Sequence, residues 1–163
     1  MMQLVERALP DYLYQRARSL FETTFERYTE HSGRYGSRIS DPGIIEYMQG
    51  PLKAIVCEGL GWESSCPKLL LSEVWVCEDE PEFEIPFHVD DVYKQISCVL
   101  YMGSDFQGTS FMDISRGEIT VEPKENLLVC FGSRGVLHRV KKTPCKRYTI
   151  QFHYYEQSAP DDP

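Results

Sequence analysis

Apolar residues in the first third of the chain recur at helical spacing. Between Pro10 and about Glu30 successive apolar positions are separated by 4, 3, 1, 4 and 3 residues, which places them on one helical face. These positions are Leu13, Ala17, Leu20, Phe21, Phe25 and Tyr28. Two further helices are expected, one from Asp41 to Met48, where a capping aspartate precedes a proline, and one from Pro51 to Leu60.

From residue 69 onward the pattern changes to short runs rich in β-branched and aromatic residues, separated by turn signals such as Arg116-Gly117 and Thr143-Pro144. The expected strands are 69–76, 95–101, 109–114, 118–121, 127–131, 136–140 and 147–155. Seven short strands at this spacing predict a sandwich, a jelly roll or a barrel.

The length of 163 residues fits one domain. We expect a mainly β (α+β) chain with a helical flank at 1–66, a β core at 67–156 and a frayed tail at 157–163.

Charge and cysteine content narrow the classes of partner and compartment. The net charge of −8 argues against a nucleic-acid partner, although 134–147 holds six Lys or Arg and no acidic residue. We interpret that run as a solvated pair of strands.

The six cysteines contain no Cys-x-x-Cys pair, and the start of the chain has charged residues where a signal peptide is apolar. No apolar run is long enough to span a membrane, so we expect a reduced, cytoplasmic protein.

The candidate chemistry begins with His88-Val89-Asp90. Residues two apart on a strand point to the same face, so His88 and Asp90 can share one metal ion. His138 follows a later apolar strand, and Arg147 comes nine residues after it. Two histidines and one carboxylate form the facial triad of non-haem Fe(II) oxygenases. An inward-facing arginine can hold a carboxylate through two hydrogen bonds, and Thr149 shares the face of Arg147.

At these residues the sequence resembles the Fe(II)/2-oxoglutarate-dependent dioxygenase superfamily, and most closely its prolyl-hydroxylase-like branch. The matching segments follow the family order and span about 69–155. They are His88-Val89-Asp90, the strand 96–101 with Tyr101, the variant Gly108-Thr109-Ser110-Phe111, His138 and Arg147. The variant segment departs from the Gly-Gly-x-Leu-x-Phe pattern of the family, which leaves the subfamily and the substrate open.

The resemblance implies a double-stranded β-helix (jelly roll, cupin-like) with N-terminal flanking helices. It further implies Fe(II) held by His88, Asp90 and His138, and 2-oxoglutarate held by Arg147 with contacts from Tyr101 and Thr149. The implied catalytic set is His88, Asp90, His138 and Arg147, with ascorbate as a candidate reductant. The implied activity is hydroxylation of a C–H bond in a prolyl residue, peptide or amino acid, with release of succinate and CO2.

Several alternatives remain at this point. The substrate could instead be a small metabolite, or the chain could be a non-catalytic cupin-like binding module. Its oligomeric state is open. The acidic segment from Val76 to Phe87 is either a loop that admits a cationic or neutral substrate or a solvated spacer. Trp75, Tyr93 and Phe111 either line the site or fill the core. We interpret His31 and His153 as surface or core histidines, and Asp91 as facing away from the metal.

Overall fold

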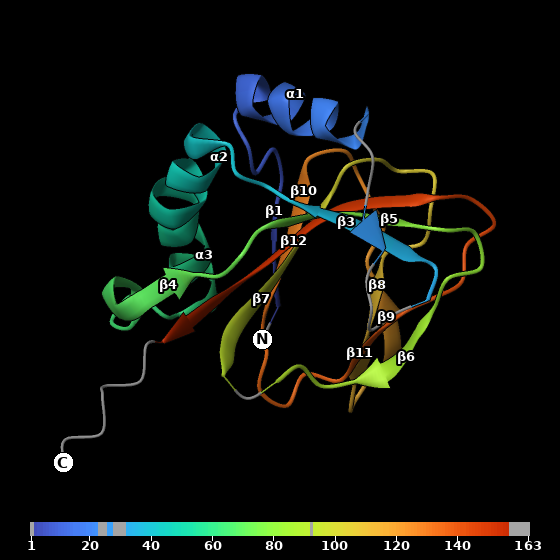
Figure 1. The fold of residues 1–163 in the computed structure, drawn as a ribbon. Coiled ribbons are helices and arrows are strands. Elements are labelled where there is room, and N and C mark those ends of the chain that lie inside the picture. Colours follow the sequence, from blue (N-terminus) through green and yellow to red (C-terminus); the bar gives the residue numbers. More distant parts are fainter. Residues whose placement is uncertain (1, 23–25, 28–31, 92, 157–163) are drawn as a thin grey trace, which may run out of the picture.

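Two β-sheets and a small group of helices make up the computed structural model, which describes residues 2–22, 26–27, 32–91 and 93–156 (Figure 1). The helical elements are α1 (Asp11–Ser19), η1 (Leu20–Glu22), α2 (Pro42–Tyr47), η2 (Met48–Leu52), α3 (Lys53–Leu60) and η3 (Cys66–Lys68). The strands are β1 (Met2–Val5), β2 (Glu26–Arg27), β3 (Arg34–Arg38), β4 (Leu69–Leu71), β5 (Trp75–Asp79), β6 (Ile85–His88), β7 (Lys94–Tyr101), β8 (Thr109–Asp113), β9 (Gly117–Thr120), β10 (Leu127–Gly132), β11 (His138–Val140) and β12 (Arg147–Glu156).

The larger sheet is antiparallel and is centred on β12. Its strand order is β1-β10-β7-β12-β5-β3-β2, and β4 also pairs with β12. The smaller sheet has the order β6-β11-β8-β9 and is antiparallel as well. The two sheets form a jelly roll, which confirms the predicted double-stranded β-helix.

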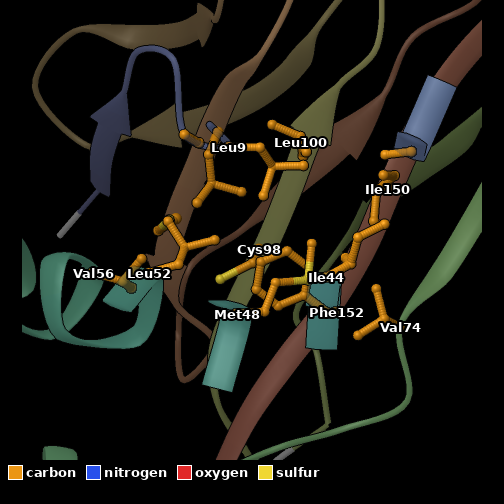
Figure 2. Close-up of a cluster of buried hydrophobic side chains, with 14 of the residues drawn as sticks. Leu9, Ile44, Met48, Leu52, Val56, Val74, Cys98, Leu100, Ile150 and Phe152 are labelled. Carbon is orange, nitrogen blue, oxygen red and sulfur yellow. The ribbon is translucent and has the colours of Figure 1, made fainter. Parts of the chain in front are cut away.

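The two faces of the larger sheet have different surroundings, because successive side chains on each strand point to opposite faces. On β7, Ile96, Cys98 and Leu100 pack with the helices in the main core, whereas Ser97 and Val99 line a cavity on the opposite face. Figure 2 shows the helical side of this packing, where Leu9, Ile44, Met48, Leu52 and Val56 lie against Cys98, Leu100, Ile150 and Phe152. The helices therefore cover the outer face of the sheet and leave the inner face to the cavity.

The predicted helices are confirmed in part. The Asp41 carboxylate caps α2 by accepting hydrogen bonds from the backbone N–H groups of Gly43 and Ile44, as expected. The helix expected from Pro10 to about Glu30 is wrong at 26–27, because these residues form β2 and pair with Tyr35 and Gly36 of β3. Phe25, Tyr28 and Glu30 lie outside the described residues.

The flank at 1–66 is not purely helical, since it also contributes β1 and β3 to the larger sheet. The strand expected at 69–76 is divided into β4 and the start of β5, and the acidic segment holds most of β5 and β6 rather than a long loop. The tail at 157–163 lies outside the described residues. All six cysteines are free, as predicted, and no helix in the described part of the chain combines the length and apolar character of a membrane span.

Asn126 fastens the segment before α1 to the larger sheet. Its side chain accepts a hydrogen bond from the Leu9 N–H (2.9 Å) and donates one to the Leu9 carbonyl (2.7 Å). Its backbone carbonyl accepts from Ala8, and its backbone N–H donates to Tyr101. The φ of 60° is a left-handed conformation that asparagine tolerates better than most residues.

Replacing Asn126 with alanine should lower the free energy of unfolding by about 3 kcal/mol, because two buried hydrogen bonds are lost and alanine is strained at this φ. Urea denaturation would measure the change. Glu125→Ala, at the exposed neighbouring position, is the control and should cost less than about 0.5 kcal/mol. Equal losses in the two variants would show that Asn126 is not the fastening point.

Candidate active site

A cavity of about 390 Å³ lies between the two sheets. The larger sheet contributes wall residues from β5, β7, β10 and β12, and the smaller sheet contributes residues from β6, β8 and β11. His88, Asp90 and His138 line this cavity, and so does Arg147. The four residues that carry the predicted chemistry therefore share one cavity.

Strand pairing brings the three candidate metal ligands together. His88 ends β6 and His138 begins β11, and these two residues are directly opposite each other in the antiparallel pair. One potential ligand atom from each of His88, Asp90 and His138 lies within 4.8 Å of the others. Asp90 Oδ1 is 3.8 Å from His88 Nε2 and 3.9 Å from His138 Nε2. This cluster is the only such group of histidine, cysteine or acidic side chains among the described residues.

Backbone carbonyls determine which nitrogen of each imidazole faces Asp90. His88 Nδ1 is 3.0 Å from the Pro86 carbonyl oxygen, and His138 Nδ1 is 3.0 Å from the Val136 carbonyl oxygen. A carbonyl can only accept, so both Nδ1 atoms carry a proton, and in the neutral form of each ring Nε2 presents the lone pair. Metal-binding histidines are held in this way in known sites.

The second oxygen of Asp90 is held by a buried serine network. Ser97 donates its hydroxyl hydrogen to Asp90 Oδ2, so its oxygen can accept from Ser133 Oγ at 2.7 Å and from His153 Nδ1 at 3.3 Å. These contacts orient the carboxylate and leave Oδ1 directed toward the two imidazoles. Ser97, Ser133 and His153 were not among the site residues predicted from the sequence.

The protonation states suit a divalent metal ion. Burial alone would raise the pKa of the Asp90 carboxyl, but the hydrogen bond from Ser97 and the interactions with His138 and Lys94 outweigh it and hold this pKa below its ordinary value. Burial lowers the pKa of His138, and the Val136 carbonyl and Asp90 offset this only in part. A carboxylate and a neutral imidazole are therefore the stable forms near pH 7, as metal coordination requires.

Arg147 forms a cationic end of the cavity. The side chain is buried, and Nη2 donates to Thr109 Oγ1 at 3.3 Å. Its Nη1 is 3.5 Å from Asp79 Oδ2, and neither Nε nor Nη1 has a hydrogen-bond partner among the described residues. Asp79 is already bound by Arg34, so two buried cations face one buried anion. This excess of positive charge suits a carboxylate.

Tyr101 and Thr149 are close to Arg147 but do not line the cavity. The Tyr101 hydroxyl accepts a hydrogen bond from the Thr109 N–H at 2.7 Å, and its ring centre is 5.9 Å from Arg147 Cζ. Thr149 Oγ1 accepts from Gln151 Nε2 at 3.1 Å. The predicted contacts of these two residues with 2-oxoglutarate therefore stay predictions.

The sequence did not decide whether three aromatic residues line the site or fill the core, and the structure places two in the cavity wall and one in the core. Trp75 and Tyr93 line the cavity, whereas Phe111 packs edge-on against Phe131 in a small core cluster. Asp91 is exposed and lies 3.8 Å from Lys94, so its exclusion from the ligand set agrees with the structure. His153 lines the cavity, contrary to its interpretation as an ordinary surface or core residue. His31 lies outside the described residues.

The idea that the acidic segment guides a substrate by its charge stays a prediction, and the cavity wall gives it no support. None of its five carboxylates lines the cavity, and four of them have partners: Glu78 binds Lys146, Asp79 binds Arg34, Glu80 accepts from Tyr35, and Glu84 lies near Lys142. The basic run at 134–147 supplies two of these partners, while Arg139 and Lys141 bind Glu118. Only His138–Val140 and Arg147 of this run lie in strands, so the interpretation as a solvated pair of strands is confirmed only in part.

No family model matches the chain, and no sufficiently similar curated protein is found. Similar solved structures nevertheless exist. A *Pseudomonas putida* prolyl-4-hydroxylase is 19% identical, with a TM-score of 0.74 over 96% of this chain and 93% of that one. A *Burkholderia pseudomallei* oxidoreductase of the 2OG-Fe(II) oxygenase family is 13% identical, with a TM-score of 0.79 over 99% and 88%.

A third similar structure is a *Trichoplax adhaerens* prolyl hydroxylase in complex with a peptide fragment of the hypoxia-inducible factor. It is 14% identical, with a TM-score of 0.73 over 95% of this chain and 83% of that one. The agreement covers the helical flank as well as the β core. Across nearly its whole length, the chain therefore has the fold of prolyl-hydroxylase-type 2-oxoglutarate- and Fe(II)-dependent oxygenases.

Proposed function

We propose that the chain is an Fe(II)- and 2-oxoglutarate-dependent oxygenase that hydroxylates a C–H bond. The observation that carries this proposal is the placement of His88, Asp90, His138 and Arg147 around one cavity of this fold. When bound, iron and 2-oxoglutarate supply the activation of O2, and 2-oxoglutarate is consumed to succinate and CO2 as the substrate gains a hydroxyl group.

The side chains fit both groups. Two imidazole nitrogens and one carboxylate oxygen lie close together, and a three-ligand set of this kind leaves further metal positions open. The buried N–H groups of Arg147 without hydrogen-bond partners among the described residues suit the distal carboxylate of 2-oxoglutarate.

The rest of the cavity wall is partly apolar and aromatic. Val99, Phe131 and Val140 provide apolar surface in the cavity wall, and the ring centre of Phe131 lies 4.7 Å from that of His138. Trp75 and Tyr93 offer apolar and aromatic contact area for a substrate. Under this proposal the chain holds and orients the reactants, while the metal and co-substrate carry the redox chemistry.

The proposed substrate is a prolyl residue in a peptide or protein, or a free amino acid. The prolyl hydroxylases among the similar folds support this choice, and one of them is in complex with a peptide. Free thiols at all six cysteines agree with a proposed cytoplasmic location. Succinate release, measured with Fe(II), 2-oxoglutarate and ascorbate across peptide and amino-acid libraries, tests the function. Absence of 2-oxoglutarate binding would favour a cupin-like binding module.

Asp90→Ala should reduce Fe(II)-dependent succinate release at least about 100-fold while leaving the fold intact, because the only anionic ligand is removed. Asp91→Ala is the matched control at the neighbouring exposed position and should retain turnover. Circular dichroism would confirm folding. Turnover of 2-oxoglutarate by Asp90→Ala at the parental rate would refute the ligand assignment.

Arg147→Ala should raise the 2-oxoglutarate concentration for half-maximal turnover by roughly 100-fold or more, since a buried charged hydrogen-bond partner is lost. The affinity for Fe(II) should change little, because Arg147 is not among the converging ligands. Arg147→Lys keeps the charge but loses the two-pronged geometry, so an intermediate value is expected. Unchanged 2-oxoglutarate dependence in both variants would contradict the anchor role.

Ser97→Ala should weaken metal binding about 10- to 100-fold, because Asp90 Oδ2 loses the donor that orients it. Titration with Mn(II), used as an air-stable probe, measures this without turnover. Ser110→Ala removes another buried serine, whose hydroxyl is paired with Thr120 away from the triad, and should leave metal affinity unchanged. Equal metal affinities in the two variants would mean that the serine network does not position Asp90.

A further inference from the structure

A second arginine, Arg34, lies at the cationic end of the cavity and comes from the N-terminal flank. It is on β3, which pairs with β5 so that Arg34 is opposite Asp79, and Asp79 is in turn opposite Arg147 of β12. The three residues therefore form one row across three neighbouring strands. Their exposed fractions are 5% for Arg34, 1% for Asp79 and 1% for Arg147. Arg34 and Arg147 both line the cavity.

The Asp79 carboxylate is committed to Arg34. Arg34 Nε donates to Oδ1 at 2.5 Å and Arg34 Nη2 donates to Oδ2 at 2.8 Å, which is the two-pronged geometry of a strong arginine–carboxylate pair. Arg34 Nη1 also donates to Gln151 Oε1 at 3.3 Å, and its guanidinium lies 4.8 Å from the centre of the Phe83 ring. Arg34 is thus fixed on several sides, and its bond to Asp79 is well defined.

Arg147 makes only a long contact with the same carboxylate. The separation of 3.5 Å between Arg147 Nη1 and Asp79 Oδ2 exceeds hydrogen-bond length for a charged pair, and Nη1 is without a hydrogen bond among the described residues. A movement of roughly 0.7 Å would shorten it to the usual length of about 2.8 Å. Asp79 is therefore a close competitor for the arginine that the co-substrate needs.

We propose that Arg34 is a positioning residue that occupies Asp79 and thereby keeps Arg147 available for the distal carboxylate of 2-oxoglutarate. This inference rests on the proposed function. Without Arg34, the buried Asp79 would pair with Arg147, and the end of the cavity would become neutral. With Arg34 in place, the three side chains carry one net positive charge, which a bound carboxylate neutralises in a site shielded from water.

Substitutions at Arg34 and Asp79 separate this role from simple structural support. Arg34→Met removes the two N–H donors that bind Asp79, so Asp79 and Arg147 together leave this end of the cavity with no net charge. Asp79→Asn keeps both arginines but removes the carboxylate, so the end of the cavity carries two positive charges. The double variant Arg34→Met/Asp79→Asn restores the single positive charge on Arg147. The affinity for 2-oxoglutarate should depend on the net charge at this end of the cavity and on whether Arg147 is unpaired with Asp79. It should not depend on the presence of Arg34 itself.

The measurement is anaerobic calorimetric titration of 2-oxoglutarate into Mn(II)-loaded protein. Arg34→Met should raise the Kd at least about 20-fold, whereas the double variant should return to within about threefold of the parent. Asp79→Asn should bind as tightly as the parent or more tightly. Arg18→Gln, which removes an exposed pair with Glu125 outside the cavity wall, is the control and should leave the Kd unchanged.

Each contrary result has a distinct meaning. A double variant as weak as Arg34→Met would show that Arg34 contacts 2-oxoglutarate directly or only supports the fold, and the inference would be wrong. Weaker 2-oxoglutarate binding in Asp79→Asn would equally show that the inference is wrong. If Arg34→Met does not fold, Asp79→Asn and the double variant still test the inference. A parent protein that fails to bind 2-oxoglutarate, or an Arg147→Ala variant with unchanged Kd, would instead overturn the proposed function.

Discussion

The strict alternation of β12 is the constraint on which both the core and the site depend. Ile150, Phe152 and Tyr154 face the helices and are fully buried, while Arg147, Gln151 and His153 face the cavity. A slip of one residue in register would exchange these two sets, placing a guanidinium in the apolar core and aromatic rings in the cavity. The pairing of β12 with both β5 and β7 therefore stabilises the fold and positions the polar residues in the same step.

A polar site between two sheets is tolerated because nearly every buried group has a partner. Carbonyls hold the histidine Nδ1 atoms, Ser97 holds Asp90, and Arg34 holds Asp79. Burying such groups unpaired would cost several kcal/mol each, on the order of 1–3 for a neutral group and more for a charge. Arg147 is the departure from this rule, since two of its guanidinium nitrogens, Nε and Nη1, have no hydrogen-bond partner among the described residues. A binding site is where an incomplete pairing of this kind is expected, because a ligand completes it.

The metal triad was predictable from the sequence, whereas the surroundings of Arg147 were not. His88 and Asp90 carry a local signal, since two residues apart on a strand means one face, and the resemblance then identified His138 and Arg147. Arg34 and Asp79 are 45 positions apart, Arg34 on a strand that the apolar pattern did not reveal and Asp79 on the part of β5 beyond the expected strand at 69–76. Acidic residues hid the alternation of β5, and a glycine weakened that of β3. Ser97 did offer a signal, because a polar residue inside a strand buried on both faces must find a partner.

The role of β3 changes how the flank relates to the β core. By resemblance the matched motifs begin near residue 69, and the segment before them was expected to be a helical flank. In the structure that segment extends the larger sheet beyond β5 and places a cation in the cavity wall. Asp79 lies within the β core, yet the residue that neutralises it comes from the flank. A chain beginning at residue 69 would therefore keep all three metal ligands while leaving a buried carboxylate beside Arg147, so the boundary between flank and core does not separate a support from a complete site.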